Sequence, residues 1–136
     1  MRFMVLVKAT KDSEAGVLPT PEQFAEMGKF NEQLAKDGVI LAADGLQASS
    51  KGARIRFGGG RPTVTDGPFA ETKELLAGFW IVQGKSKEEI ISRFMSAPFD
   101  RGEELEIRQI FEVEDFGENL PDDVREQEEH RRSGSK

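Results

Sequence analysis

Two segments of the chain are apolar on both faces of a predicted strand. In Phe3–Val7 successive side chains point to opposite sides of the backbone, yet all five are apolar. Leu75–Val82 has the same property, because Leu75, Phe79 and Ile81 alternate with other apolar side chains. Strands of this kind are covered on both faces. The pattern therefore predicts two inner strands of one sheet.

Two helices are predicted, each with a local start and stop signal. Thr20 can cap a helix over Pro21–Asp37, Gln23 can complete its capping box, and Gly38 is a typical stop. A second helix begins after Ser86, where a capping box with Glu89 is expected, and it ends before Pro98. The predicted buried side chains of both helices are Phe24, Met27, Phe30, Leu34, Ala35, Ile90, Ile91, Phe94 and Met95.

Shorter extended segments fill the rest of the chain. Alternation of polar and apolar residues makes Arg54–Phe57 a half-exposed strand, and the glycines of Gly58–Arg61 connect it to a partner strand. The segment with Lys11, Asp12 and Gly16, which leads to Thr20, is expected to be a loop. The remaining predicted strands are Val39–Leu46, Pro62–Asp66 and Leu105–Val113.

The order of elements predicts an α+β fold with a ferredoxin-like split βαβ arrangement. Its sheet is antiparallel, and right-handed crossovers place both helices on one face. The other face then remains apolar and uncovered. A second copy of the chain, packed sheet to sheet around a two-fold axis, is the simplest cover. We therefore expect a homodimer.

Charge is distributed unevenly along the 136 residues. The net charge is -6, and residues 114–136 carry eight acidic against four basic side chains. We therefore expect an α+β domain over residues 1–113 and an acidic tail over 114–136, docked near Phe116 and then helical or disordered. A sequence pI of 4.9 argues against a nucleic-acid-binding surface.

The missing residue types exclude several kinds of chemistry. The chain has no cysteine and no tyrosine, and His130 is its one histidine. Disulfides, thiolate chemistry, a Ser/His/Asp triad and a multi-histidine metal site are therefore excluded. We expect no metal and no cofactor. No run approaches about 18 apolar residues, and no signal segment opens the chain, so we expect no membrane contact and a cytoplasmic location.

The segment Asp66–Glu74 concentrates ionisable groups beside a rigid Gly-Pro turn and an apolar strand. Within it, Asp66 or Glu71 is a candidate general base, and Lys73 can stabilise an anion. The alternative is that Asp66 caps its own turn while the other charges are solvated. Three arginines, Arg54, Arg56 and Arg108, either bind a carboxylate or phosphate or form the exposed face of a sheet.

The same segment carries a family resemblance. Asp66–Glu74, followed by Leu76, Gly78, Phe79 and Trp80, resembles the signature of the DGPF-domain branch of the YciI-like proteins. Met1–Leu6, the helix start at Pro21-Glu22 and Gly45–Gln47 are also similar to that branch, and the resemblance covers roughly residues 1–113. It implies a dimeric α+β barrel and a bacterial cytoplasmic protein.

The resemblance says less about activity. Relatives include a dehydrochlorinase acting on a chlorinated aromatic compound, related barrels include muconolactone isomerase, and some DGPF proteins resemble partners of extracytoplasmic-function sigma factors. Other YciI-like members carry a His/Asp pair. Here no histidine lies between Pro21 and Asp37, and Ala97 precedes Pro98-Phe99. The activity inferred from that pair therefore does not transfer.

Two functional hypotheses follow. The first is a small-molecule-binding protein, lyase- or isomerase-like if it is an enzyme, with its pocket between sheet and helices beside the DGPF loop. Asp66 would be its base, Glu71 a second carboxylate and Lys73 an electrostatic partner. The predicted ligand contacts are Phe69, Phe79, Trp80 and Arg56. The alternative is a non-catalytic regulatory or interaction module whose acidic tail contacts a basic partner.

Overall fold

A four-stranded antiparallel sheet forms the centre of the computed structural model, which describes residues 1–134. The strands lie in the order β2-β5-β1-β6. Their bounds are Arg2–Lys8 for β1, Ile40–Gly45 for β2, Leu76–Gln83 for β5 and Leu105–Gln109 for β6. The two strands predicted to be inner, β1 and β5, pair with each other. This is the strand order of a ferredoxin-like fold, so the predicted fold class is confirmed.

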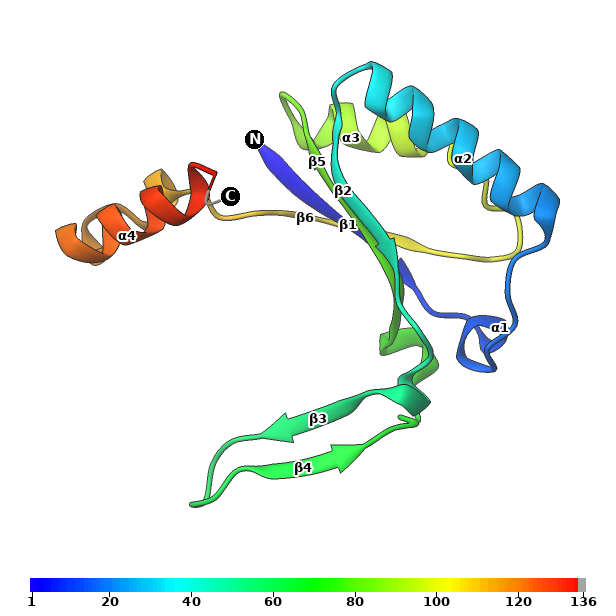
Figure 1. The fold of residues 1–136 in the computed structure, drawn as a ribbon, viewed down its shortest axis with the longest axis horizontal. Helices are drawn as coiled ribbons and strands as arrows, with labels where there is room; N and C mark the ends of the chain where they lie inside the picture. The colour runs from blue at the N-terminus through cyan, green and yellow to red at the C-terminus, as the bar shows by residue number, and fades with distance from the viewer. Residues whose placement is uncertain (135–136) are drawn as a thin grey trace.

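Both long helices of the domain cover one face of this sheet (Figure 1). Helix α2 spans Pro21–Lys36, and Thr20 and Gln23 exchange the two hydrogen bonds of the predicted capping box. Helix α3 spans Lys87–Phe94 and is capped by the Ser86 hydroxyl.

The capping box predicted for α3 is only half present. The Glu89 carboxylate accepts the N–H of Lys85, 2.6 Å away, instead of that of Ser86. The reason lies at Gly84: a Cβ there would stand 3.2 Å from the Glu89 Oε2 atom. Because glycine leaves this space open, the carboxylate reaches one residue further back along the chain.

The core lies between the sheet and the two helices. Phe3 and Val5 of β1 and Trp80 and Val82 of β5 face the helices and are buried. They pack against Leu34, Ile90 and Phe94. The predicted buried faces of the helices included too many residues, since Phe24, Ile91 and Met95 are 58%, 40% and 81% exposed. The α3 helix has only eight residues, and Ile90 and Phe94 are the two that it buries.

The opposite face of the sheet is partly exposed; it is apolar on β1 and β5 and charged on β6, where Arg108 and Glu106 lie opposite Met4 and Leu6. On that face Met4 pairs with Ile81, and Leu6 pairs with Phe79, across β1 and β5. No helix or strand among residues 1–134 covers it in Figure 1. We call these four side chains the open face.

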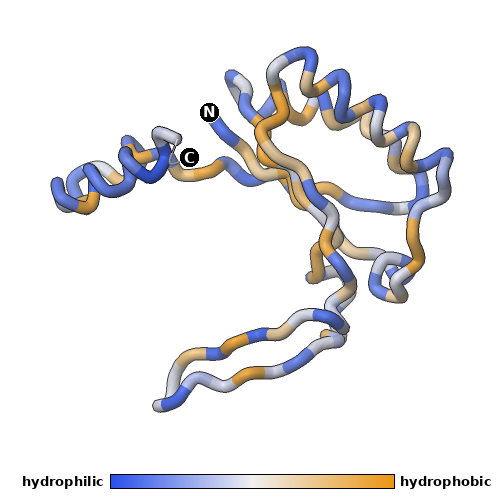
Figure 2. Tube along the Cα trace, in the orientation of Figure 1, coloured by the Kyte–Doolittle hydropathy of each residue, from blue (hydrophilic) through white to orange (hydrophobic). Residues whose placement is uncertain are grey.

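A separate hairpin projects from the sheet (Figure 1). Its strands are β3, Ala53–Arg56, and β4, Thr63–Asp66, and Ile55 lies opposite Val64. All eight strand residues are exposed, so the prediction of a half-exposed strand was wrong. In Figure 1 no other helix or strand of residues 1–134 lies against either side of the hairpin. Figure 2 shows apolar positions on both of its strands.

The C-terminal segment also leaves the body of the molecule. Strand β6 ends at Gln109, earlier than the predicted Val113, and the 3-10 helix η3 (Val113–Asn119) follows. Phe111 stacks on Phe116 with a centroid distance of 5.2 Å. The 3-10 helix leads away from the sheet, and helix α4 (Asp122–Arg132) then runs back, so that Arg132 donates to the Phe111 carbonyl at 3.0 Å. Within residues 1–134 no helix has both the length and the hydropathy that a bilayer span requires.

The remaining elements are short. The 3-10 helices η1 and η2 span Ser49–Lys51 and Thr72–Glu74. The region around Lys11 was predicted to be a loop, but it forms the helical turn α1, Lys11–Glu14. Its start is fixed by a capping box in which Thr10 and Ser13 exchange hydrogen bonds.

Candidate functional site

The DGPF segment, which is the signature at residues 66–74, is held in place by a serine from a distant loop. The Ser49 hydroxyl accepts the N–H of Phe69 at 3.1 Å and donates to the Glu14 carboxylate at 2.5 Å. The backbone N–H of Ser49 donates to the other oxygen of that carboxylate, at 3.0 Å. These bonds lower the pKa of Glu14, because they stabilise its charged form. One side chain thus joins three chain segments.

Gly67 lies against the same loop. Its N–H donates to the Gly52 carbonyl at 2.9 Å. A Cβ at position 67 would lie 1.7 Å from the Ser49 carbonyl oxygen, far inside contact distance. This close approach of two backbones requires glycine, and it explains the second residue of the signature.

Phe69 of the signature carries a cation on its ring. The guanidinium of Arg54, at the base of the hairpin, lies 3.8 Å from the ring centroid. Such cation–π contacts favour arginine because its planar group stacks on the ring. The aromatic residue of the signature therefore links the hairpin to the DGPF turn.

The structure places the three candidate catalytic residues along one segment. Asp66 ends β4 and Glu71 precedes η2, and both are exposed. No hydrogen bond or ion pair joins their side chains in the described part of the chain. Lys73 belongs to η2, but its side chain lies outside the described residues. Their convergence on one substrate stays a prediction.

The four predicted ligand contacts lie in different places. Phe69 is half-buried in the DGPF turn, Phe79 belongs to the open face, and Arg56 is exposed on the hairpin. Trp80 faces the helices and donates its indole N–H to the Asn31 side chain at 2.8 Å. The sequence predicted a pocket between the sheet and the helices. The core around Trp80 fills that space instead.

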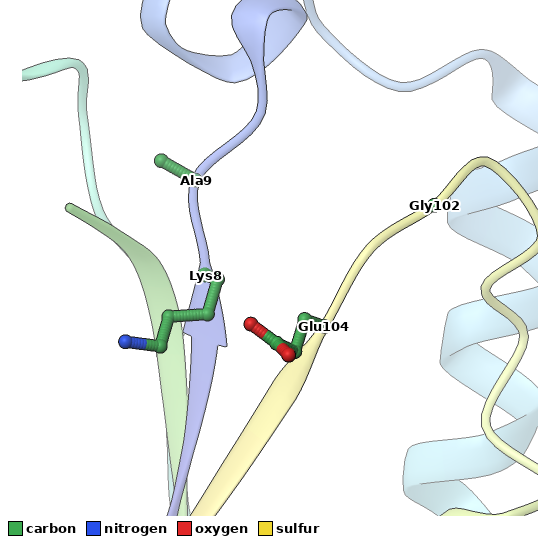
Figure 3. Close-up of a pocket in the computed structure, with 4 residues that line it drawn as sticks. All are labelled: Lys8, Ala9, Gly102 and Glu104. Atoms are coloured by element: carbon green, nitrogen blue, oxygen red, sulfur yellow. The ribbon is translucent and has the colours of Figure 1, made fainter. Parts of the chain in front are cut away.

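A hollow of about 320 Å³ lies instead at one end of the sheet (Figure 3). It is lined by Lys8, Ala9, Gly102 and Glu104. The N–H of Ala9 donates to the carbonyl of Leu75, which directly follows η2, at 2.9 Å. The hollow therefore adjoins the residue that directly follows the signature segment.

Charges beside this hollow are paired across strands. The Lys8 ammonium lies 3.2 Å from the carboxylate of Glu106 on β6. Hydrogen bonds from Lys8 and then from Arg108 lower the pKa of Glu106. Sequence reasoning missed Lys8 and Glu104. A lysine that ends an otherwise apolar strand is a signal, but only the strand order brings it beside residues 102–104.

No arrangement of three or more His, Asp or Glu side chains within residues 1–134 is suited to hold a metal ion. The hollow offers the Glu104 carboxylate, the Lys8 side chain and the backbone of Ala9 and Gly102, while Figure 3 shows the Lys8 ammonium pointing away from Glu104. Such a site can bind and orient a polar molecule, and it can transfer protons through carboxylates.

Two comparisons with known proteins bear on this arrangement. Residues 1–114 match the YCII-related domain. A 66-residue stretch is 41% identical to the uncharacterized protein R00369 of Rhizobium meliloti (strain 1021), covering 48% of the chain and 53% of that relative. The matched stretch thus spans about half the length of the relative.

Proposed function

The chain belongs to the family of YCII-related domains, and from that premise we propose that it is a dimeric protein that binds a small polar molecule. The binding site is the hollow lined by Lys8 and Glu104, at the end of the sheet that carries the DGPF segment. The observation that carries the proposal is the position of this hollow. It lies between the Lys8 side chain, the Glu104 carboxylate and the chain leading out of the signature.

The DGPF segment has a structural part in this proposal. Gly67 and Phe69 fix the loop through Ser49, and this loop leads through η2 into β5. Asp66 remains the candidate base and Glu71 the second carboxylate of the segment, with Lys73 as their electrostatic partner, for a lyase- or isomerase-like reaction. Their role requires a ligand that extends from the hollow toward the turn.

Amide spectra can test the site directly. A panel of small hydroxy acids, keto acids and lactones is added to the ¹⁵N-labelled protein. A ligand is expected to shift the amide signals of Ala9 and Gly102, and Lys8→Ala should weaken its binding about tenfold or more, since a charged hydrogen bond is worth about 1.5–3 kcal/mol. Lys29→Ala, on the exposed side of α2, is the matched control.

The outcomes separate binding from catalysis. Ligand-induced shifts confined to other regions, or equal affinity in Lys8→Ala and Lys29→Ala, contradict the proposed site. If a ligand is turned over, unchanged turnover in Asp66→Asn and Glu71→Gln removes these two residues from the catalytic role while leaving the binding site in place.

A second candidate function is a regulatory interaction module, favoured by the acidic segment after Glu112. Residues 114–134 carry eight acidic and three basic side chains, and most of them are exposed. A chain that ends at residue 116 should then lose a basic protein partner that the full chain retains in a pull-down. Equal recovery by both chains contradicts this role for the tail.

A further inference from the structure

Two arms extend from opposite ends of the open face. The hairpin, residues 53–66, precedes β5, whose first residue pairs with Lys8 at the end of β1. The C-terminal arm, residues 110–134, follows β6, whose last residue pairs with Phe3 at the start of β1. The seven residues of β1 separate these ends by about 20 Å. In Figure 1 both arms lie on the side away from α2 and α3.

The two arms have opposite charges. Residues 51–66, which comprise the hairpin and its base, contain four basic side chains and one acidic side chain, Asp66. Residues 114–134 contain eight acidic and three basic side chains. Arg56 and Arg61 form no ion pair within residues 1–134, and the same holds for Glu114 and Glu118.

The arms also carry matching apolar surfaces. On the hairpin, Phe57, Val64 and Ile55 are 75%, 67% and 58% exposed. On the C-terminal arm, Phe111 is 64% exposed and lies beside a hollow of about 300 Å³, which Asp115 also lines. Aromatic residues and arginine are enriched at protein–protein contacts, and opposite charges on the two surfaces orient the partners.

We infer that the hairpin of one copy docks on the C-terminal arm of a second copy, with Phe57 against Phe111. The inference rests on the dimer proposed above and defines its geometry. A two-fold axis that crosses the strands brings each hairpin to the opposite end of its partner's sheet, where the acidic arm lies. An axis along the strands would instead bring basic hairpin to basic hairpin, which like charges oppose.

This contact also gives the hairpin the cover that its own chain does not supply. An isolated two-stranded hairpin is marginally stable in water. Here both strands are exposed throughout, and their anchor to the body is at the base, through Arg54 and Gly67. Docking on the second copy buries the face that carries Ile55, Phe57 and Val64.

Charge reversal combined with sedimentation measurements tests the pairing. The charge of the hairpin is reversed with Arg56→Glu and Arg61→Glu, and its aromatic contact is removed with Phe57→Ser. Each of these two variants should raise the dimer dissociation constant by about tenfold or more. Adding Glu114→Lys and Glu118→Lys to the reversed hairpin should restore the constant to within about threefold of the original. Pairing of hairpin to hairpin predicts no such restoration.

The control changes the same net charge elsewhere. Lys29→Glu with Lys87→Glu alters exposed positions on the covered side of the sheet and should leave the dissociation constant within about threefold. The arm contact is overturned if the hairpin reversal has no larger effect than this control, or if the combined reversal fails to restore the dimer. An unaltered chain that stays monomeric at every concentration overturns the dimer itself. Intact near-UV spectra of the variants show that loss of the dimer is not loss of the fold.

Discussion

Gly67 shows how one residue can be fixed by another segment of the chain. Its Cβ position is occupied by the Ser49 carbonyl oxygen, 1.7 Å away. Neither backbone can move freely, because Ser49 is bound to Glu14 and Phe69. The signature glycine is therefore required by a contact that its own turn does not contain.

We expect Gly67→Ala to lower the free energy of unfolding by about 1–3 kcal/mol, the usual cost of forcing extra atoms into a packed site. Urea unfolding followed by circular dichroism measures it. Gly28→Ala is the matched control: it lies within α2, its added Cβ meets nothing within 4 Å beyond its chain neighbours and the adjacent backbone of its own helix, and it should stabilise the protein by up to about 1 kcal/mol. Equal effects of both substitutions would show that the contact with Ser49 is unimportant.

Trp80 depends on a single polar partner. Its ring is 4% exposed, and its indole N–H donates to the Asn31 side chain. We expect Asn31→Ala to cost about 1–3 kcal/mol, because the indole N–H is left unsatisfied. Asn31→Asp retains an oxygen acceptor and should cost less. Because Trp80 is the one tryptophan of the chain, its fluorescence reports unfolding directly. Equal losses in the two variants would contradict this account.

At the scale of the element, the end of helix α4 is held by Arg132, which donates to the Phe111 carbonyl at 3.0 Å and to the Glu112 carboxylate. Glu112 accepts hydrogen bonds from Arg2 of β1 at 2.8 Å and from Arg132 of α4 at 3.1 Å. The hydrogen bond from Arg2, with the nearby positive charges, holds the pKa of Glu112 below its ordinary value of 4.5. The carboxylate is therefore stabilised in the folded state.

The docking of α4 should weaken in acid. A lowered folded-state pKa stabilises the protein above the ordinary value of 4.5, and that stabilisation is lost as the pH falls through the folded-state pKa. Amide exchange in α4, compared with exchange in β1, should accelerate over this range. Glu112→Gln should show fast exchange in α4 already at neutral pH and a smaller change on acidification. A pH response identical in both proteins would exclude Glu112 as the link.

The elements that the sequence predicted well are those with local signals. Thr20 and Gln23 lie three residues apart, and the cap they form depends on nothing else. The turn α1 was missed because Thr10 and Ser13 fix only four helical residues, too few for a periodic pattern. The exposure of the hairpin was mispredicted because alternation in Arg54–Phe57 indicates a face and does not say what covers it.

The sequence predicted the segment that carries the candidate residues, but it did not predict the hollow beside that segment. Asp66–Glu74 is recognisable as a run of residues, since its composition is local. Its contact with Ser49 and its nearness to Lys8 depend on which strands are neighbours in the sheet, and no spacing in the chain encodes them. Trp80 was placed among the ligand contacts because apolar strands with two covered faces do not show which face meets the helices.

At the scale of the whole molecule, the open face is the strongest indication of a second copy. Four apolar side chains, Met4, Leu6, Phe79 and Ile81, lie side by side on two central strands with no cover among residues 1–134. A contiguous apolar surface of this kind marks an interaction site on a folded protein.

A charged residue in the open face should therefore separate the subunits. We expect Ile81→Glu to raise the dimer dissociation constant by about a hundredfold or more, because a buried charge without a partner costs several kcal/mol. Sedimentation velocity across a concentration series measures it. Leu18→Glu, at a position already 78% exposed, is the control and should leave the constant unchanged. A dimer of unaltered strength in Ile81→Glu would place the interface elsewhere.

The strand order has a consequence for how the protein is made. Strand β1 leaves the ribosome well before its two partners, β5 and β6, which begin at Leu76 and Leu105. The sheet cannot close until nearly the whole domain has been synthesised, and the apolar first strand stays unpaired during that time. Such long-range pairing makes folding slow and leaves the nascent chain exposed to aggregation. The growing chain is thus a natural client for chaperones that hold Phe3–Val7 until its partners arrive.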